Sequence, residues 1–151
     1  MVFNLGTIAL QTGNANQSFT APVNGYLNLN KTLARVTTKL DCSTGLPVVG
    51  VYKGSTKLAT MGTTHTATAG SITGIADHDA VGTGYVFTGD PSTSAEEKAY
   101  PRPTGERGYD SCPAVKITAG DIIKFNVDTA CTDGSAAAGA VEIFADFEWA
   151  V

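Results

Sequence analysis

VEIFADFEWAV, residues 141–151, is the most regular stretch of the sequence and decides the fold class. Apolar side chains occupy every second position, and acidic side chains occupy several positions between them. Because successive side chains of a strand point to opposite faces, this pattern predicts a strand with one buried face and one solvated face. The predicted inward set is Val141, Ile143, Ala145, Phe147, Trp149 and Val151, and the predicted outward set is Glu142, Asp146 and Glu148.

The stretch before it repeats this pattern. KITAGDIIKFNVD, residues 116–128, predicts a turn at Ala119-Gly120, followed by a strand that turns Ile123, Phe125 and Val127 to one face. LPVVGVYKGSTKLATMG, residues 46–62, predicts a β-hairpin because the pair Gly54-Ser55 separates two apolar segments. The middle and last thirds of the chain therefore predict paired strands.

Short strands are also expected in the first third. Apolar alternation at residues 3–10 breaks at Gly6, where a strand can bulge. QSFTAPVNGYLNLN, residues 17–30, predicts two more strands separated by Pro22 and Asn24-Gly25. The spacing of apolar residues over 33–40 suits one helical turn or a bent strand, and Thr37-Thr38 favour the strand. Further short strands are expected around Ile72 and at residues 85–87.

These elements predict one all-β domain spanning residues 1–151. The chain has 17 glycines, 42% hydrophobic residues and only 16% charged residues, which favours many short strands joined by turns. About eight strands at this spacing would form a sandwich or a barrel.

The net charge of −4 argues against nucleic acid as a partner, because binding to phosphates depends on lysine and arginine. No stretch approaches the ~20 apolar residues of a membrane span, so no membrane partner is expected. The N-terminal residues lack the pattern of a secretion signal.

The chain has three cysteines, Cys42, Cys112 and Cys131, which lie far apart in the sequence. Because their number is odd, at least one cannot form an intramolecular disulfide, and a reducing compartment fits best.

Catalytic and metal-binding patterns are weak. Asp77-His78-Asp79 suggests a dyad or a metal site, but neighbouring side chains in an extended chain point apart. DHDAVGTG, residues 77–84, resembles a calcium loop but lacks its bidentate glutamate. Glu96-Glu97 are adjacent in a charged loop, where solvated side chains are the simpler explanation than a glycosidase pair. The sequence therefore predicts no enzyme, no catalytic residue, no metal and no cofactor.

Residues 88–113 are rich in proline and charge and form a long predicted loop. Tyrosine and arginine are enriched where proteins bind each other, so the loop is expected to contact a partner through Tyr100, Arg102, Arg107 and Tyr109.

Three segments carry a resemblance to a known group of proteins. FTAPVNGYLNLN at residues 19–30, VVGVYKGSTKLAT at 48–60 and KITAGDIIKFNVDT at 116–129, followed by a terminal strand, resemble the jelly-roll decoration, or cement, proteins on the heads of tailed bacteriophages. The x-x-A-G-D-x-I turn is also similar to that of trimeric jelly rolls of the C1q and tumour-necrosis-factor type.

The resemblance implies a jelly-roll-like antiparallel sandwich that binds the major capsid protein and stabilises the shell. It implies assembly in the host cytoplasm, a final place on the virion surface, and self-association, with a trimer weakly favoured. Expected partner contacts are Phe3 and Leu5 in the N-terminal arm, the 88–113 loop, and Phe144, which breaks the alternation of the closing strand. The alternative is a carbohydrate- or receptor-binding β-domain of a phage fibre or tail, although such sites usually need aromatic platforms and Trp149 is the only tryptophan.

Overall fold

The computed structural model describes residues 1–42, 44–45, 47–61, 64–65, 72–73, 82, 84–89 and 114–149. Within these ranges nearly all regular structure is β-strand, and the one helical element is the short 3₁₀ turn η1, Leu29–Lys31. No helix in the described part of the chain is long and apolar enough to cross a membrane. The all-β prediction is confirmed.

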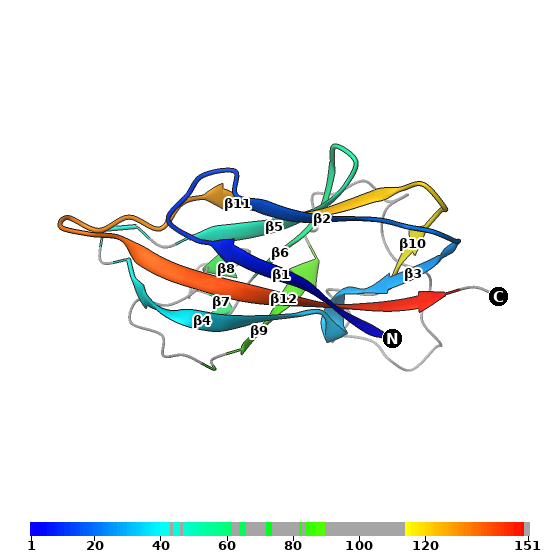
Figure 1. Cartoon of the computed structure of the whole chain (residues 1–151), viewed down its shortest axis with the longest axis horizontal. Coiled ribbons are helices and arrows are strands. Elements are labelled where there is room, and N and C mark those ends of the chain that lie inside the picture. The colour runs from blue at the N-terminus through cyan, green and yellow to red at the C-terminus, as the bar shows by residue number, and fades with distance from the viewer. Residues whose placement is uncertain are drawn as a thin grey trace.

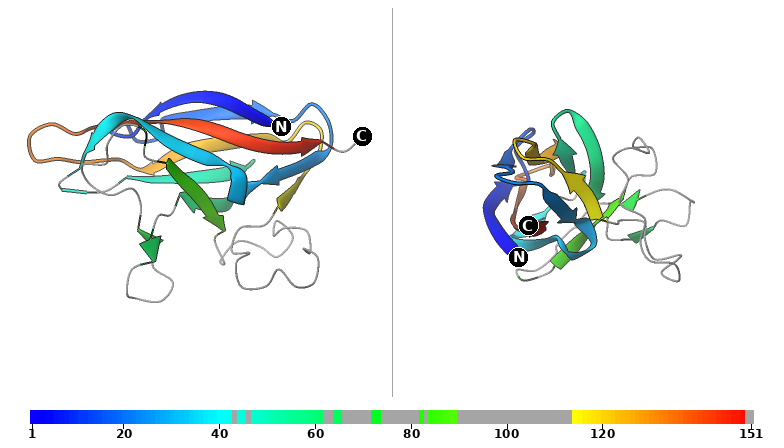
Figure 2. Two further views of the ribbon diagram at one scale, coloured as in Figure 1. Left: turned by 90° about the horizontal axis from the view of Figure 1, so that it is seen from below. Right: turned by 90° about the vertical axis from the view of Figure 1, so that its right-hand side faces the viewer.

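The strands form two antiparallel sheets packed face to face (Figures 1 and 2). Sheet one contains β1 (Val2–Ala9), β12 (Ala138–Trp149), β4 (Leu33–Asp41) and β9 (Gly84–Gly89), with β3 (Gly25–Asn28) and β10 (Ala114–Ile117) beside the end of β12. Sheet two contains β2 (Asn16–Thr20), β11 (Ile122–Thr129), β5 (Val48–Lys53) and β6 (Thr56–Met61). A separate ribbon pairs β7 (Thr64–His65) with β8 (Ile72–Thr73).

The strand pairs are nested in the manner of a jelly roll. β1 pairs with β12, β2 with β11, β4 with β9, and β5 with β6, so that early strands lie beside late ones. β9 also pairs with β6, which joins the two sheets along one side. The chain therefore forms the jelly-roll-like sandwich that the resemblance implies. In the described residues, eight strands make up the nested pairs, β3 and β10 extend sheet one, and β7 and β8 stay apart as the separate ribbon.

β1 contains the predicted bulge. Its register against β12 shifts between Asn4 and Gly6, and Gly6 has a φ of 105°, which residues with a side chain rarely adopt. Because of the extra residue, Phe3 and Ile8 both face the core although they are five positions apart. The hairpin turn at Gly54-Ser55 is also confirmed, and Gly54 has a φ of 59°.

The core lies between the sheets and is lined by alternate residues of β12, β11 and β5. Of the predicted inward side chains of β12, Val141, Ile143, Ala145 and Phe147 are fully buried, and Trp149 is half-buried against the same cluster. The inward residues predicted for β11 are also buried. Val151 lies outside the described residues.

The outward face of β12 differs from the prediction at Asp146, which is only 8% exposed. β1 lies on one side of Asp146, and β3 with η1 lies on the other, so neighbouring chain covers the carboxylate. Its Oδ2 atom accepts a hydrogen bond of 2.9 Å from Asn28 Nδ2, and its backbone nitrogen donates one of 3.2 Å to Thr32 Oγ1. The prediction that Asp146 faces water is therefore wrong, whereas Glu148 is exposed as predicted.

Candidate functional site

The outer face of sheet one carries Phe144, the residue that interrupts the alternation of β12. In the strand register, Phe144 lies opposite Asn4 of β1, and Glu142 lies opposite Arg35 of β4. Val2, at the start of β1, is 59% exposed. We call Val2, Asn4, Arg35, Glu142 and Phe144 the Phe144 patch.

Glu142 organises this patch. Its Oε2 atom accepts a hydrogen bond of 3.3 Å from Arg35 Nη2, and its Oε1 atom accepts one from Asn4 Nδ2. The Arg35 guanidinium carbon lies 5.5 Å from the centre of the Phe144 ring, within the range of a cation–π contact. Because an exposed ion pair contributes only about 0–1 kcal/mol, these contacts orient the arginine more than they stabilise the fold. Phe144 is left half-buried, with its ring beside a charged group.

A second group of polar side chains lies on the outer face of sheet two, and we call Tyr52, Lys57, Asn126 and Asp128 the Asp128 cluster. The Asp128 Oδ1 atom accepts hydrogen bonds of 2.8 Å from the Tyr52 hydroxyl and 2.9 Å from Asn126 Nδ2. Its Oδ2 atom lies 3.1 Å from Lys57 Nζ. The carboxylate therefore joins the three strands β5, β6 and β11 through side chains.

These contacts shift two pKa values. Burial, the hydrogen bond to Asp128 and the negative charge of that carboxylate together raise the pKa of Tyr52 to about 12. For Asp128, burial acts in the opposite direction to the partners, since it favours the protonated form. Hydrogen bonds from the three donors and the positive charge of Lys57 outweigh burial and lower the pKa of the Asp128 carboxyl below its usual value. Tyr52 therefore stays a donor and Asp128 an acceptor at neutral pH.

The predicted contact residues Phe3 and Leu5 turn toward the core instead of projecting from the surface. The Phe3 ring lies 5.8 Å from that of Phe19 and 5.7 Å from that of Phe147. The Trp149 ring is parallel to Phe147 at 5.1 Å. Phe3, Phe19, Phe147 and Trp149 thus fill the end of the sandwich, and Leu5 packs against the same core. Both Phe3 and Leu5 remain half-buried, so a partner could reach only part of each side chain.

The other predicted contact residues, Tyr100, Arg102, Arg107 and Tyr109, lie outside the described residues, and so do Asp77, His78, Asp79, Glu96 and Glu97. Among the residues that the structure describes, no group of three or more histidine, cysteine, aspartate or glutamate side chains could hold a metal ion.

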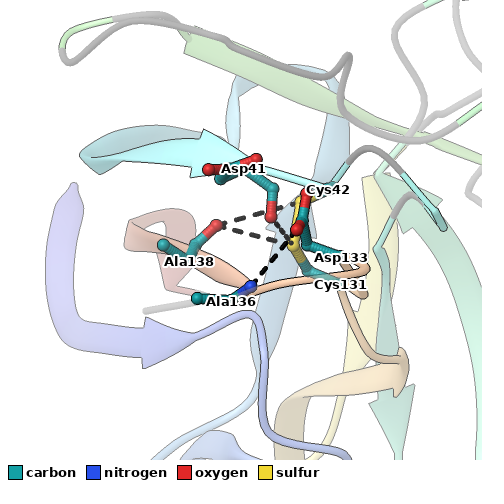
Figure 3. The surroundings of a disulfide bond; sticks show 6 residues. All are labelled: Asp41, Cys42, Cys131, Asp133, Ala136 and Ala138. Carbon is teal, nitrogen blue, oxygen red and sulfur yellow. Dashed lines mark hydrogen bonds between the residues drawn. A yellow bond between two sulfur atoms is a disulfide. The ribbon is translucent and has the colours of Figure 1, made fainter.

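Cys42 and Cys131 form a disulfide (Figure 3). Cys42 directly follows β4 of sheet one, and Cys131 lies just beyond β11 of sheet two, so the bond links the two sheets. The sequence shows only that at least one of the three cysteines cannot form an intramolecular disulfide, and it does not predict that Cys42 pairs with Cys131. The nested strand pairing brings these two cysteines together although they are 89 positions apart in the sequence. At that separation no local pattern indicates that they pair. Cys112 lies outside the described residues.

Neither the Asp128 cluster nor Arg35 was singled out from the sequence. Their partners come from different strands, and only the strand register shows that these side chains meet. The one available signal was the placement of Asn126 and Asp128 on the polar side of an alternating strand.

Comparisons with models of protein families, with curated proteins and with solved structures find no match for this chain.

Proposed function

We propose that the protein is a non-enzymatic accessory subunit that decorates a bacteriophage head by binding the major capsid protein. The observation that supports this proposal is the Phe144 patch, in which an outward aromatic ring, an arginine and the exposed Val2 share one face of a rigid sheet. Aromatic residues and arginine are enriched in the centres of protein interfaces.

The contacts in the patch support docking on a preformed surface. Arg35 is held beside Phe144 by Glu142, so little side-chain freedom would be lost on binding. The patch lies on three adjacent strands, since β12 pairs with β1 on one side and with β4 on the other. This pairing makes the face rigid. In this proposal, residues 88–113 add contacts to the major capsid protein through Tyr100, Arg102, Arg107 and Tyr109. The protein then functions on the virion surface.

Binding to purified shells that lack the protein tests the proposal. Phe144→Ser should abolish cosedimentation with the shells while leaving the far-ultraviolet circular dichroism spectrum unchanged. Glu148→Gln is the matched control, because Glu148 lies on the same strand and is exposed outside the patch. Shells carrying the protein should also survive heating and osmotic shock better than bare shells. Equal survival of the two would refute the cement role, and normal binding by Phe144→Ser would refute the role of the patch.

We also propose self-association, with a trimer favoured. Among the described strands, β1 pairs only with β12, and β2 pairs only with β11, so each has one edge without a strand partner. Closed symmetry is a common way to cover such edges. Sedimentation velocity at high micromolar concentration should show a species larger than the monomer, and a monomer both in solution and on the shell would contradict this proposal.

A second candidate function is carbohydrate or receptor binding. It is favoured by the Asp128 cluster, where the half-buried Tyr52 ring lies beside the Asp128 carboxylate on the outer face of sheet two, and Lys124 Nζ is 5.4 Å from the ring centre. Aromatic rings and such polar groups are suited to the faces and hydroxyls of sugars. A glycan array probed with the wild type and with Tyr52→Ala tests this function, since a binding signal that the substitution removes would establish it.

A further inference from the structure

The disulfide lies at one end of the sandwich and is sealed from solvent. Cys42 is 2% exposed and Cys131 is 1% exposed. The bond lies beside the end of β4 and the start of β12, at the end of the sandwich opposite the start of β1 and the end of β12, whose positions Figure 1 shows. It closes a loop of chain between sequence positions 42 and 131. The bond therefore holds together the two sheets at a place that thiols and disulfides in solution reach only when this end of the sandwich opens locally.

Main-chain hydrogen bonds hold Cys131, and the segment that follows Cys42, in place without the sulfur–sulfur bond. The Cys131 nitrogen donates to the Leu10 carbonyl at 2.8 Å. Thr132 donates its nitrogen to the Gly45 carbonyl at 2.9 Å, and its own carbonyl accepts from the Gly45 nitrogen at 3.1 Å. The segments after β4 and β11 are thus joined by their backbones next to the disulfide.

The surroundings also suit the two thiols. The Asp41 carbonyl oxygen lies 3.2 Å from Cys131 Sγ, and the Ala138 carbonyl oxygen lies 3.5 Å from the same atom and 3.9 Å from Cys42 Sγ (Figure 3). A disulfide sulfur has no hydrogen to donate, so these oxygens are only neighbours of the oxidised pair. Each reduced cysteine has one S–H group, and the same oxygens would accept it. Reduction therefore leaves no buried donor without an acceptor.

From these contacts we infer that the sandwich folds with Cys42 and Cys131 as thiols, and that the disulfide is a covalent lock added later, in an oxidising environment. The lock closes by thiol–disulfide exchange with a disulfide oxidant. One cysteine thiolate attacks the oxidant and displaces one of its thiols, and the second cysteine thiolate then displaces the other. The protein loses two protons and two electrons, and the oxidant is reduced to two thiols.

This inference does not depend on the proposed function. It reconciles the reducing compartment that the sequence predicts with the disulfide that the structure contains. A chain can be made in a reducing compartment, as the sequence predicts, and gain its disulfide after leaving it. The closed loop is long, so the lock should shift the folding equilibrium by roughly a thousandfold. Burial of both sulfurs then makes reduction of the folded protein slow.

The test begins with the unmodified chain purified under reducing conditions. We expect the reduced protein to give a near-ultraviolet circular dichroism spectrum and a cooperative urea transition. Oxidised glutathione should then remove two hydrogens from the mass, link Cys42 to Cys131 in a peptide map, and move the urea midpoint upward. A reduced protein without cooperative unfolding would overturn the inference, and so would oxidation that joins Cys112 to either partner.

Two variants distinguish the effect of the Cys42–Cys131 disulfide from any effect of the Cys112 thiol. Cys112→Ser should oxidise and gain stability as the unmodified chain does. The double variant Cys42→Ala and Cys131→Ala should remain folded, with a urea midpoint near that of the reduced protein, and should not respond to oxidised glutathione. An unfolded double variant alongside an unfolded reduced chain would mean that the bond is required for folding, which contradicts the inference.

Discussion

The carboxylate of Asp128 in β11 lies over Gly50 of the neighbouring strand β5, in the space that a side chain at position 50 would fill. From there it reaches the Tyr52 hydroxyl and Lys57. A Cβ atom at Gly50 would collide with the carboxylate and approach the Tyr52 ring. The absence of a side chain at this strand position is thus what allows the Asp128 cluster to form.

Gly50→Ala should therefore destabilise the protein by about 1–3 kcal/mol, as overpacking in a well-packed site does. The urea midpoint measures this change. Gly13→Ala is the matched control, because a Cβ atom there would have no heavy atom within 4 Å. It should change stability by less than about 0.5 kcal/mol. Equal effects of the two substitutions would contradict the packing of Asp128 against Gly50.

The raised pKa of Tyr52 predicts a loss of stability at alkaline pH. Its contribution is complete below the pKa of an unfolded tyrosine, near 10. As pH rises from there toward the folded pKa of about 12, the unfolded state releases the proton first, so the free energy of unfolding decreases. Tyr52→Phe should remove this part of the decrease and should lower stability near neutral pH, because Asp128 loses a donor. Urea unfolding across the alkaline range checks it, and identical slopes for the two proteins would refute the assignment.

Phe147 should be among the most costly residues to truncate. It is fully buried and contacts the rings of Phe3, Phe19 and Trp149. Phe147→Ala should reduce the free energy of unfolding by about 3–5 kcal/mol, whereas Glu148→Gln, one position away on the exposed face, should change it by less than about 0.5 kcal/mol. Denaturation curves of both variants decide the outcome, and a small effect at Phe147 would mean that the inward face of β12 is misassigned.

Local patterns in the sequence were enough to predict most of the strands and the buried faces of β11 and β12, but not the short strands β7 and β10. Alternation in β11 and β12 depends on a period of two residues, which needs no knowledge of the partner strand. The bulge at Gly6 and the turn at Gly54 have local causes as well, because both need a backbone conformation that glycine adopts easily. The jelly-roll-like arrangement came from a resemblance, since alternation alone leaves sandwich and barrel open.

Contacts between distant parts of the chain were not predictable in the same way. Cys42 meets Cys131 only because β4 and β11 end side by side in different sheets. Asp128 meets Tyr52 because β5 pairs with β11 in one particular register. The outward position of Phe144 was predicted, but the arginine beside it comes from β4 and needed the pairing of Arg35 with Glu142. An outward position also proved different from an exposed one at Asp146.

Asp146 provides the sharpest test of that difference. Asp146→Ala would remove the acceptor of the Asn28 side-chain amide in a site that is only 8% exposed. A buried donor without an acceptor costs about 1–3 kcal/mol, and the half-buried Asn28 amide should fall toward the lower end of that range, so the urea midpoint should fall. Glu148→Ala on the same face is the control and should have little effect, because that side chain is exposed. The double variant Asn28→Ala and Asp146→Ala should be less destabilised than the sum of the single variants, with a coupling of about 0.5 kcal/mol or more. Additive effects, or equal effects of Asp146→Ala and Glu148→Ala, would mean that Asp146 is solvated as the alternating pattern first predicts.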